Sequence, residues 1–184
     1  MSRPTVAHID LGALAHNARA IGAFMAARRG AAAPALVGVV KADAYGHGAV
    51  PVARTLVGAG AAMIACADIE EGVELREAGI AVPILIFGPF SLGDMDAVFD
   101  ASLTPTVMTP TSARRLQAAA ARRGVRLACH LGIDTGMHRL GLRHDNLART
   151  MPEVLAAPNL QLTGVYTHFA TADAPGDALF AAQR

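Results

Sequence analysis

The sequence predicts an α/β fold of the (β/α) barrel type. Short segments that are apolar on both faces alternate along the 184 residues with segments whose apolar residues recur at helical spacing. This alternation favours a parallel sheet with right-handed helical crossovers. Polar residues follow the apolar segments, at Lys41, Asp43, Asp68, Asp134 and His168. Active groups at the carboxyl ends of several strands are typical of a barrel, although open α/β sheets also bind ligands there.

The first expected element is a helix. Asp10 is a suitable N-cap, apolar residues recur at helical spacing from Leu11 to Met25, and Gly30 ends the pattern. Strands are then expected at residues 36–40, 62–67, 83–87, 103–107, 126–133 and 160–168. Further helices are expected at residues 50–57, 69–78, 92–99, 111–123 and 146–155. No GxGxxG follows the first strand, so the sequence lacks the signature of a nucleotide-binding Rossmann unit.

The length allows only part of a barrel. A complete one has eight βα units and typically ~250 residues, whereas about six units are expected in this sequence. The last residues lie within what resembles the next helix. We therefore expect residues 1–184 to form a partial, N-terminal barrel domain from the front part of a longer protein.

Composition limits the partners and the compartment. The formal net charge is +1 and the arginines are scattered, which gives no charged surface for nucleic acid. No uncharged apolar run approaches the roughly 18 residues of a membrane span, and the N-terminus does not resemble a signal peptide. Cys66 and Cys129 lie within apolar segments without CxxC spacing, as expected of buried thiols in a reducing compartment. The cytoplasm is the expected location.

Lys41 ends the apolar segment ALVGVV. A lysine in this position is often a surface group whose stem lies along apolar neighbours. At a partly apolar barrel mouth, however, the charged amine is disfavoured, and a neutral amine is what Schiff-base formation requires. The following Tyr45-Gly46-His47-Gly48 offers flexible backbone and free amides to a phosphate, although an ordinary turn would have the same composition.

Two later segments also contain residues with chemically reactive or ligand-binding side chains. Arg139, in IDTGMHRLG, can bind a carboxylate or phenolate through its planar fork, or can instead cap a helix. His168, in GVYTHF, shares a strand face with Tyr166, but a histidine at a strand end is often only structural. No metal site is expected, because His130, Asp134 and His138 lack a converging spacing, and the GxSxG of a hydrolase is absent.

Together these segments resemble alanine racemase, a pyridoxal-phosphate (PLP) enzyme with a fold-type III barrel. VVKADAYGHG is similar to the family's cofactor-lysine signature, IDTGMHRLG to its arginine loop and GVYTHFATAD to its histidine strand. Weaker similarity extends through HIDLGALAHNARAI, CADIEEGVELREAGI, PILIFG and LTPTVM. The resemblance spans nearly all of this sequence but only about the first half of a family member.

The resemblance implies a role for each site residue. Lys41 would hold PLP as an imine and act as the base facing the D-alanine side of the substrate carbon. Tyr45 would contact the cofactor phosphate, and Arg139 would lie near the cofactor phenolate and the substrate carboxylate. His168 would belong to a hydrogen-bond chain beneath the cofactor ring. The implied activity interconverts L- and D-alanine for peptidoglycan precursors, in a full-length homodimer.

Two departures from the family accompany the resemblance. The family's second acid is a tyrosine from the partner subunit's C-terminal β-domain, which this sequence does not include, so the chain alone is expected to be inactive. Gly132 stands where many members have a lysine, often carbamylated. The alternatives are another fold-type III PLP protein, such as a broad-specificity amino-acid racemase or a PLP-binding protein, and a non-catalytic fragment.

Overall fold

The computed structural model describes residues 5–89, 95–174 and 176–184. The chain divides into two compact units, Met1–Leu85 and Ile86–Arg184, and each is described by itself. Within these described ranges no helix has both the length and the apolar character needed to cross a bilayer.

The first unit begins with α1 (Leu11–Arg29), and its ends are set by two local signals. The Asp10 carboxylate accepts a hydrogen bond from the Ala13 amide at 2.9 Å, and Gly30 leaves the helix at a φ of 54°. The remaining elements are η1 (Gly30–Ala32), β1 (Val37–Val39), α2 (Lys41–Gly46), α3 (Ala49–Gly58), β2 (Met63–Cys66) and α4 (Ile69–Glu77). Strands β1 and β2 pair in parallel, as expected for a βαβ unit, with α1 packed on α3.

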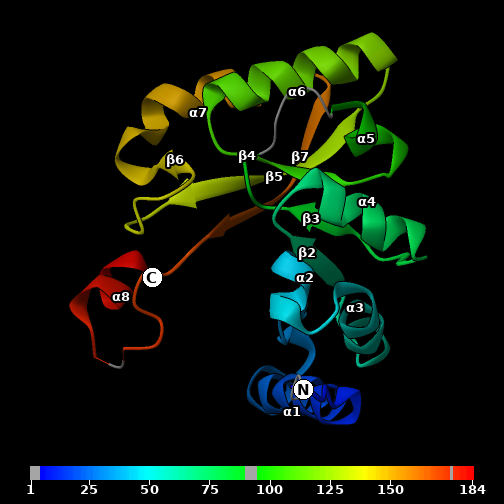
Figure 1. Ribbon diagram of the computed structural model, residues 1–184. Helices are drawn as coiled ribbons and strands as arrows, with labels where there is room; N and C mark the ends of the chain where they lie inside the picture. Colours follow the sequence, from blue (N-terminus) through cyan, green and yellow to red (C-terminus); the bar gives the residue numbers. More distant parts are fainter. Residues whose placement is uncertain (1–4, 90–94, 175) are drawn as a thin grey trace. The chain divides into compact units, whose positions relative to one another are not determined.

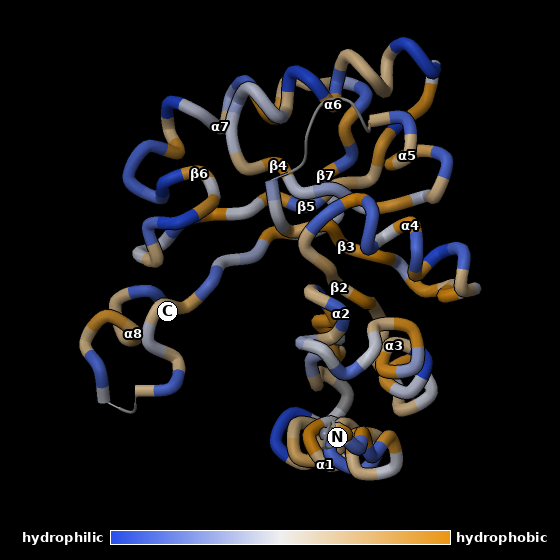
Figure 2. The backbone as a smooth tube through the Cα atoms, viewed as in Figure 1, coloured by the Kyte–Doolittle hydropathy of each residue, from blue (hydrophilic) through white to orange (hydrophobic). Residues whose placement is uncertain are grey.

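Strand β3 (Ile84–Ile86) spans the boundary between the units. All three of its residues are buried, and Figure 2 shows its path as hydrophobic. A strand without polar alternation is expected where both faces of a parallel sheet are covered.

The second unit is organised around β5 (Leu127–Asp134). This strand pairs in parallel with β4 (Thr104–Val107), with β7 (Leu160–Thr167) and, at its carboxyl end, with β6 (Leu142–Arg143). The helical elements are α5 (Met95–Asp100), α6 (Pro110–Arg123), η3 (His144–Asn146), α7 (Leu147–Leu155) and α8 (Ala178–Gln183). Figure 1 shows α6 lying along β4, β5 and β7, where it buries Leu116 and a row of alanines.

The expected strands and helices are confirmed in order, with ends that differ by a few residues. Three residues of the helix expected at 92–99, residues 92–94, lie outside the described part of the chain, and the rest belong to α5. Four elements were not predicted. They are the 3-10 helices η1 and η3, the two-residue strand β6, and α2, which occupies the segment beginning at Lys41 that was expected to be a flexible turn. The conformation of α2 is the main departure from expectation.

Candidate functional site

Lys41 is presented by a left-handed turn. It follows Val40, which is only 1% exposed and donates its amide to the Ala65 carbonyl of β2 at 2.9 Å. The next four residues, Ala42 to Tyr45, all have φ between 51° and 58°. The left-handed conformation costs an L-residue about 1–2 kcal/mol, and a run of four without glycine is rare. The segment after Lys41 is therefore strained, and the surrounding contacts must stabilise it.

Several hydrogen bonds hold this turn. The Ala44 amide donates to the Val40 carbonyl at 2.8 Å, and the Ala44 side chain is buried. The Asp43 carboxylate accepts from the Ala49 amide at 2.6 Å, where α3 begins, and the Asp43 carbonyl accepts from Gly48. The Glu71 carboxylate of α4 accepts from the Ala42 amide at 2.5 Å. The turn is thus fixed by contacts from α3, α4 and the end of β1.

One sequence-based expectation about this turn is wrong. The amides of residues 45–48 were expected to be free for a phosphate, but those of His47 and Gly48 donate to the Ala44 and Asp43 carbonyls at 3.2 and 2.9 Å. The first amide of α3, that of Ala49, is bound to the Asp43 carboxylate. Pro51, in the same first turn of α3, has no amide hydrogen. The carboxylate of Asp43 already supplies the negative charge that a helix N-terminus favours.

Tyr45 remains available as a polar side chain beside Lys41. Its side chain is 62% exposed, and the Lys41 ammonium lies 5.8 Å from the centre of its ring. Lys41 is half-buried and is the only lysine among the 184 residues, the other basic residues being arginines. The first unit therefore combines a single lysine amine, an aromatic ring and a constrained backbone at the carboxyl end of β1.

In the second unit, Asp134 organises the turn that carries Arg139. Asp134 ends β5 and is 7% exposed. One oxygen of its carboxylate accepts from the amides of Gly136 at 3.0 Å and His138 at 2.9 Å, and the other lies 3.5 Å from the His138 ring. Burial alone would raise the pKa of Asp134, but the two backbone hydrogen bonds and the charges of His138 and Arg143 lower it below its ordinary value.

Arg139 lies on the exposed part of this turn, before Gly141 returns the chain to β6. Gly141 has a φ of 116°, and a Cβ added there would lie 2.8 Å from the Asp134 amide nitrogen. Only glycine fits this close backbone approach. The arginine turn is consequently anchored at its start by a carboxylate and at its end by a glycine.

His168 follows β7 and is exposed, while Gln183 of α8 ties its backbone to neighbouring segments. The Gln183 amide group donates to the His168 carbonyl at 3.2 Å and to the Thr135 hydroxyl at 2.9 Å, and its oxygen accepts from the Ala170 amide. Thr135 in turn lies 2.7 Å from the Thr167 hydroxyl. Gln183 is 8% exposed, so these bonds are shielded from water and join the ends of β5 and β7.

The space beside Gly132 is occupied by an aromatic side chain. A Cβ added at Gly132 would lie 3.3 Å from the methyl carbon of Thr106 and 3.5 Å from the Tyr166 hydroxyl. Tyr166 donates to the Thr106 hydroxyl at 3.3 Å, and burial raises the pKa of its phenol. Gly132 is therefore closely covered by Thr106 and Tyr166, which leave little room for a larger side chain.

Other candidate chemistry is not supported by the geometry. Burial raises the pKa of the Cys66 thiol to about 12, assisted by Glu71 and Asp68, and raises that of Cys129 to about 11, so neither thiol is a ready nucleophile. Within residues 5–89, 95–174 and 176–184 no three His, Cys, Asp or Glu side chains are grouped to hold a metal.

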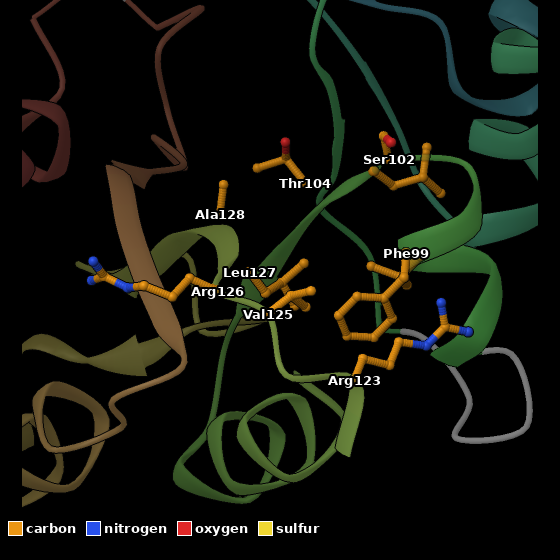
Figure 3. A pocket seen from close by; sticks show the side chains of 10 residues that line it. Phe99, Ser102, Thr104, Arg123, Val125, Arg126, Leu127 and Ala128 are labelled. Atoms are coloured by element: carbon orange, nitrogen blue, oxygen red, sulfur yellow. The ribbon is translucent and has the colours of Figure 1, made fainter. Parts of the chain in front are cut away.

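A cavity of about 620 Å³ lies in the second unit at the amino ends of β4 and β5 (Figure 3). Thr104, Leu127 and Ala128 line it together with Phe99 and Arg123. The Arg123 guanidinium is already paired with Asp96 and Asp100 at 2.8 and 2.6 Å. Arg139 and His168 follow the opposite, carboxyl ends of the strands, and in barrels the amino-end face contributes mainly to stability.

The four predicted site residues fall into two pairs. Lys41 and Tyr45 lie together in the first unit, and Arg139 and His168 belong to turns of the second unit that Gln183 connects at their base. Four residues that support the site were not predicted from the sequence: Asp43, Glu71, Asp134 and Gln183. A signal existed for two of them: Asp68 and Glu71 have capping-box spacing, and Asp134-Thr135-Gly136 has the composition of an Asx turn.

Comparison with known proteins identifies the family. Residues 9–184 match the protein family described as "Alanine racemase, N-terminal domain". The chain belongs to this family. Alanine racemase from Symbiobacterium thermophilum is 41% identical over 175 residues, which are 95% of this chain and 45% of the relative. Alanine racemase from Synechocystis sp. is 41% identical over 177 residues, which are 96% of this chain and 46% of the relative.

Solved alanine racemase structures have the same fold. The Bacillus anthracis structure, with bound L-Ala-P, has a TM-score of 0.83 and 34% identity, covering 95% of this chain and 44% of that one. The Streptomyces lavendulae structure has a TM-score of 0.82 and 35% identity, covering 95% and 45%. The predicted resemblance and the α/β barrel-type fold are confirmed. The chain spans less than half the length of the alanine racemases that it matches.

Proposed function

We propose that the chain provides the PLP-binding lysine site of an alanine racemase, which interconverts L- and D-alanine. The observation that carries the proposal is the presentation of the single lysine, at the carboxyl end of β1 in KADAYGHG, by a turn with a fixed conformation. The residues present fit the cofactor's chemistry. A half-buried primary amine can form an imine with an aldehyde, and no other lysine competes for it.

When bound, PLP withdraws electrons from the substrate's α-carbon and so makes the α-proton acidic. The Lys41 amine would hold the cofactor through its aldehyde carbon, and the same amine would serve as the base on the D-alanine side of the substrate. The Tyr45 hydroxyl, which is exposed, would donate to the cofactor phosphate. Holding the turn through Asp43 and Glu71 limits the positions that the Lys41 amine can adopt.

The roles proposed for Arg139 and His168 follow from the family resemblance. Arg139 would bind the cofactor phenolate and the substrate carboxylate through its guanidinium, which has the bidentate geometry that a carboxylate needs. His168 would belong to a hydrogen-bond chain that supports the cofactor. We further propose that residues 1–184 belong to one barrel domain, that the functional protein is a cytoplasmic homodimer, and that its D-alanine is used for peptidoglycan precursors.

The proposal is tested by reductive trapping. The purified protein is incubated with PLP, reduced with borohydride, digested and mapped by mass spectrometry. We expect one pyridoxyl-phosphate group on Lys41 and none in Lys41→Arg, which keeps the positive charge but has no amine that forms an imine. Labelling confined to the N-terminal amine would contradict the proposal.

The substrate is tested separately with a panel of L-amino acids. The PLP-loaded protein is titrated with each amino acid, and the change in the absorption spectrum of the bound cofactor is measured. Chiral chromatography checks for D-product, of which this chain alone is expected to form no appreciable amount. A spectral response at lower concentration for alanine than for the others supports alanine racemase, whereas similar responses across the panel would favour a broad-specificity racemase.

A further inference from the structure

Glu71 contacts the lysine turn as well as its own helix. It is the third residue of α4, where Asp68 is the N-cap and accepts the Glu71 amide at 2.9 Å. One oxygen of the Glu71 carboxylate accepts from the Ala67 amide at 2.7 Å. The other accepts from the Ala42 amide, 29 residues earlier in the chain, at 2.5 Å. Both carboxylate oxygens are therefore used by backbone amides, on the two strand-to-helix connections of the first unit.

Helix capping explains only half of this arrangement. In a capping box, the glutamate at the third helical position bonds back to the N-cap amide, whereas Glu71 uses one oxygen for the Ala67 amide, one residue before the N-cap. The bond to Ala42 adds nothing to the capping of α4. Ala42 is adjacent to Lys41 and is the first of the four left-handed residues. The second oxygen thus binds the Ala42 amide, where the backbone turns away from Lys41.

We propose that Glu71 is a positioning residue for Lys41, because it holds the Ala42 amide and so stabilises the left-handed turn that presents the amine. This inference rests on the proposed PLP function. A hydrogen bond to a charged group is strong enough to offset what the left-handed conformation costs one residue. Removing the bond therefore allows Ala42 to leave this conformation and changes the direction of the Lys41 side chain.

Glu71→Gln is the informative substitution. The carboxamide has nearly the same shape, but only its oxygen accepts, so one of the two amides must lose its partner. Glu70→Gln is the matched control, since it removes one negative charge from the same helical turn at an exposed side chain. Each variant is compared with the unaltered protein in thermal unfolding, in hydrogen–deuterium exchange resolved to single amides, and in the rate of PLP trapping on Lys41.

In Glu71→Gln we expect the Ala42 amide to exchange about tenfold faster and PLP trapping on Lys41 to slow about tenfold, with Glu70→Gln unchanged in both. The absorption maximum of the PLP-loaded protein should also shift, because the amine is held differently. Unchanged exchange at Ala42, unchanged trapping, or equal effects of the two variants would each overturn the proposal.

A double-mutant cycle with Ala42→Gly separates positioning from capping. Glycine adopts positive φ without strain, so the turn depends less on Glu71 when residue 42 is glycine. We expect Ala42→Gly to recover most of the stability and the trapping rate lost in Glu71→Gln. If Glu71 only caps α4, Ala42→Gly will have the same effect in the Glu71→Gln protein as in the unaltered protein. This comparison also keeps the test decisive if Glu71→Gln alone folds poorly.

Failure of the proposed function gives a different result. If the unaltered protein takes no PLP on Lys41, the PLP proposal fails, and Lys41 is then probed by reductive methylation with formaldehyde alongside exchange at Ala42. Faster exchange and altered methylation in Glu71→Gln would still support the positioning role, and unchanged values would overturn it.

Discussion

The turn after β1 and the turn after β5 are both held by carboxylates, but the carboxylates come from different distances along the chain. Asp134 binds amides two and four residues ahead of it, so the arginine turn is organised locally. The lysine turn depends on Asp43 and also on Glu71, which is 29 residues from Ala42. The position of Lys41 is therefore set by tertiary contacts of the first unit, whereas the turn around Arg139 depends largely on its own sequence.

The largest expected effect comes from the glycine of the arginine turn. Gly141→Ala in the arginine turn should destabilise the protein by about 3 kcal/mol or more, because the new methyl group would meet backbone atoms of residues 132–134 at 2.8–3.0 Å. Gly46→Ala in the lysine turn also requires a positive φ, of 81°, but has no neighbour within 4 Å. It should cost only about 1 kcal/mol.

The two alanine variants are compared by urea unfolding, monitored by circular dichroism. Equal losses of unfolding free energy would contradict the view that the arginine turn has the closer backbone packing.

An intermediate effect is expected from Asp134→Asn. The amide side chain keeps an acceptor oxygen but loses the charge, which should cost about 1–2 kcal/mol at neutral pH. Since folding lowers the pKa of Asp134 below its unfolded value near 3.9, its stabilising contribution is present above that value and is lost as the pH falls through the folded pKa. The stability difference between the two proteins should therefore be largest near pH 7 and shrink below about pH 4.

Thermal unfolding between pH 3 and pH 7 provides this measurement. A difference that stays constant over the range would show that the charge of Asp134 contributes nothing.

The smallest effect is expected when the same substitution is made in the lysine turn. Asp43→Asn should cost only about 0.5 kcal/mol, because asparagine can still accept the Ala49 amide and tolerates the left-handed conformation. Asp43 is exposed, whereas Asp134 is buried, so its charge is better screened. Chemical unfolding of the two asparagine variants side by side tests this order, and a larger loss for Asp43→Asn would reverse the comparison.

The sequence predicted the barrel-type fold because its signals are local. Apolar segments that are hydrophobic on both faces, a capping aspartate at Asp10 and a terminating Gly30 are all read from neighbouring residues. The sequence also identified the segment that carries Lys41. It did not predict the left-handed turn, since Ala42 and Ala44 have no intrinsic preference for positive φ and adopt it only through contacts with Glu71 and the start of α3.

Asp134 and Gln183, which support the site in the second unit, also differ in whether their hydrogen bonds are local in the sequence. The Asp134 turn could have been recognised from Asp134-Thr135-Gly136, because its hydrogen bonds close within a few residues. The role of Gln183 could not, because it joins Thr135, His168 and Ala170 only after β5, β7 and α8 have packed together. Isolated sequence segments contain no signal for such a residue.

The left-handed turn also affects how the chain resists proteolysis. Tyr45 is an exposed aromatic residue, the type that chymotrypsin-like proteases prefer, and exposed turns are common sites of nicking. A protease, however, binds its substrate as an extended strand. Residues 42–45 instead have left-handed backbone angles, and buried and hydrogen-bonded neighbours hold them there. Cleavage after Tyr45 therefore requires the turn to open first. The segment should resist proteolysis although the Tyr45 side chain is accessible.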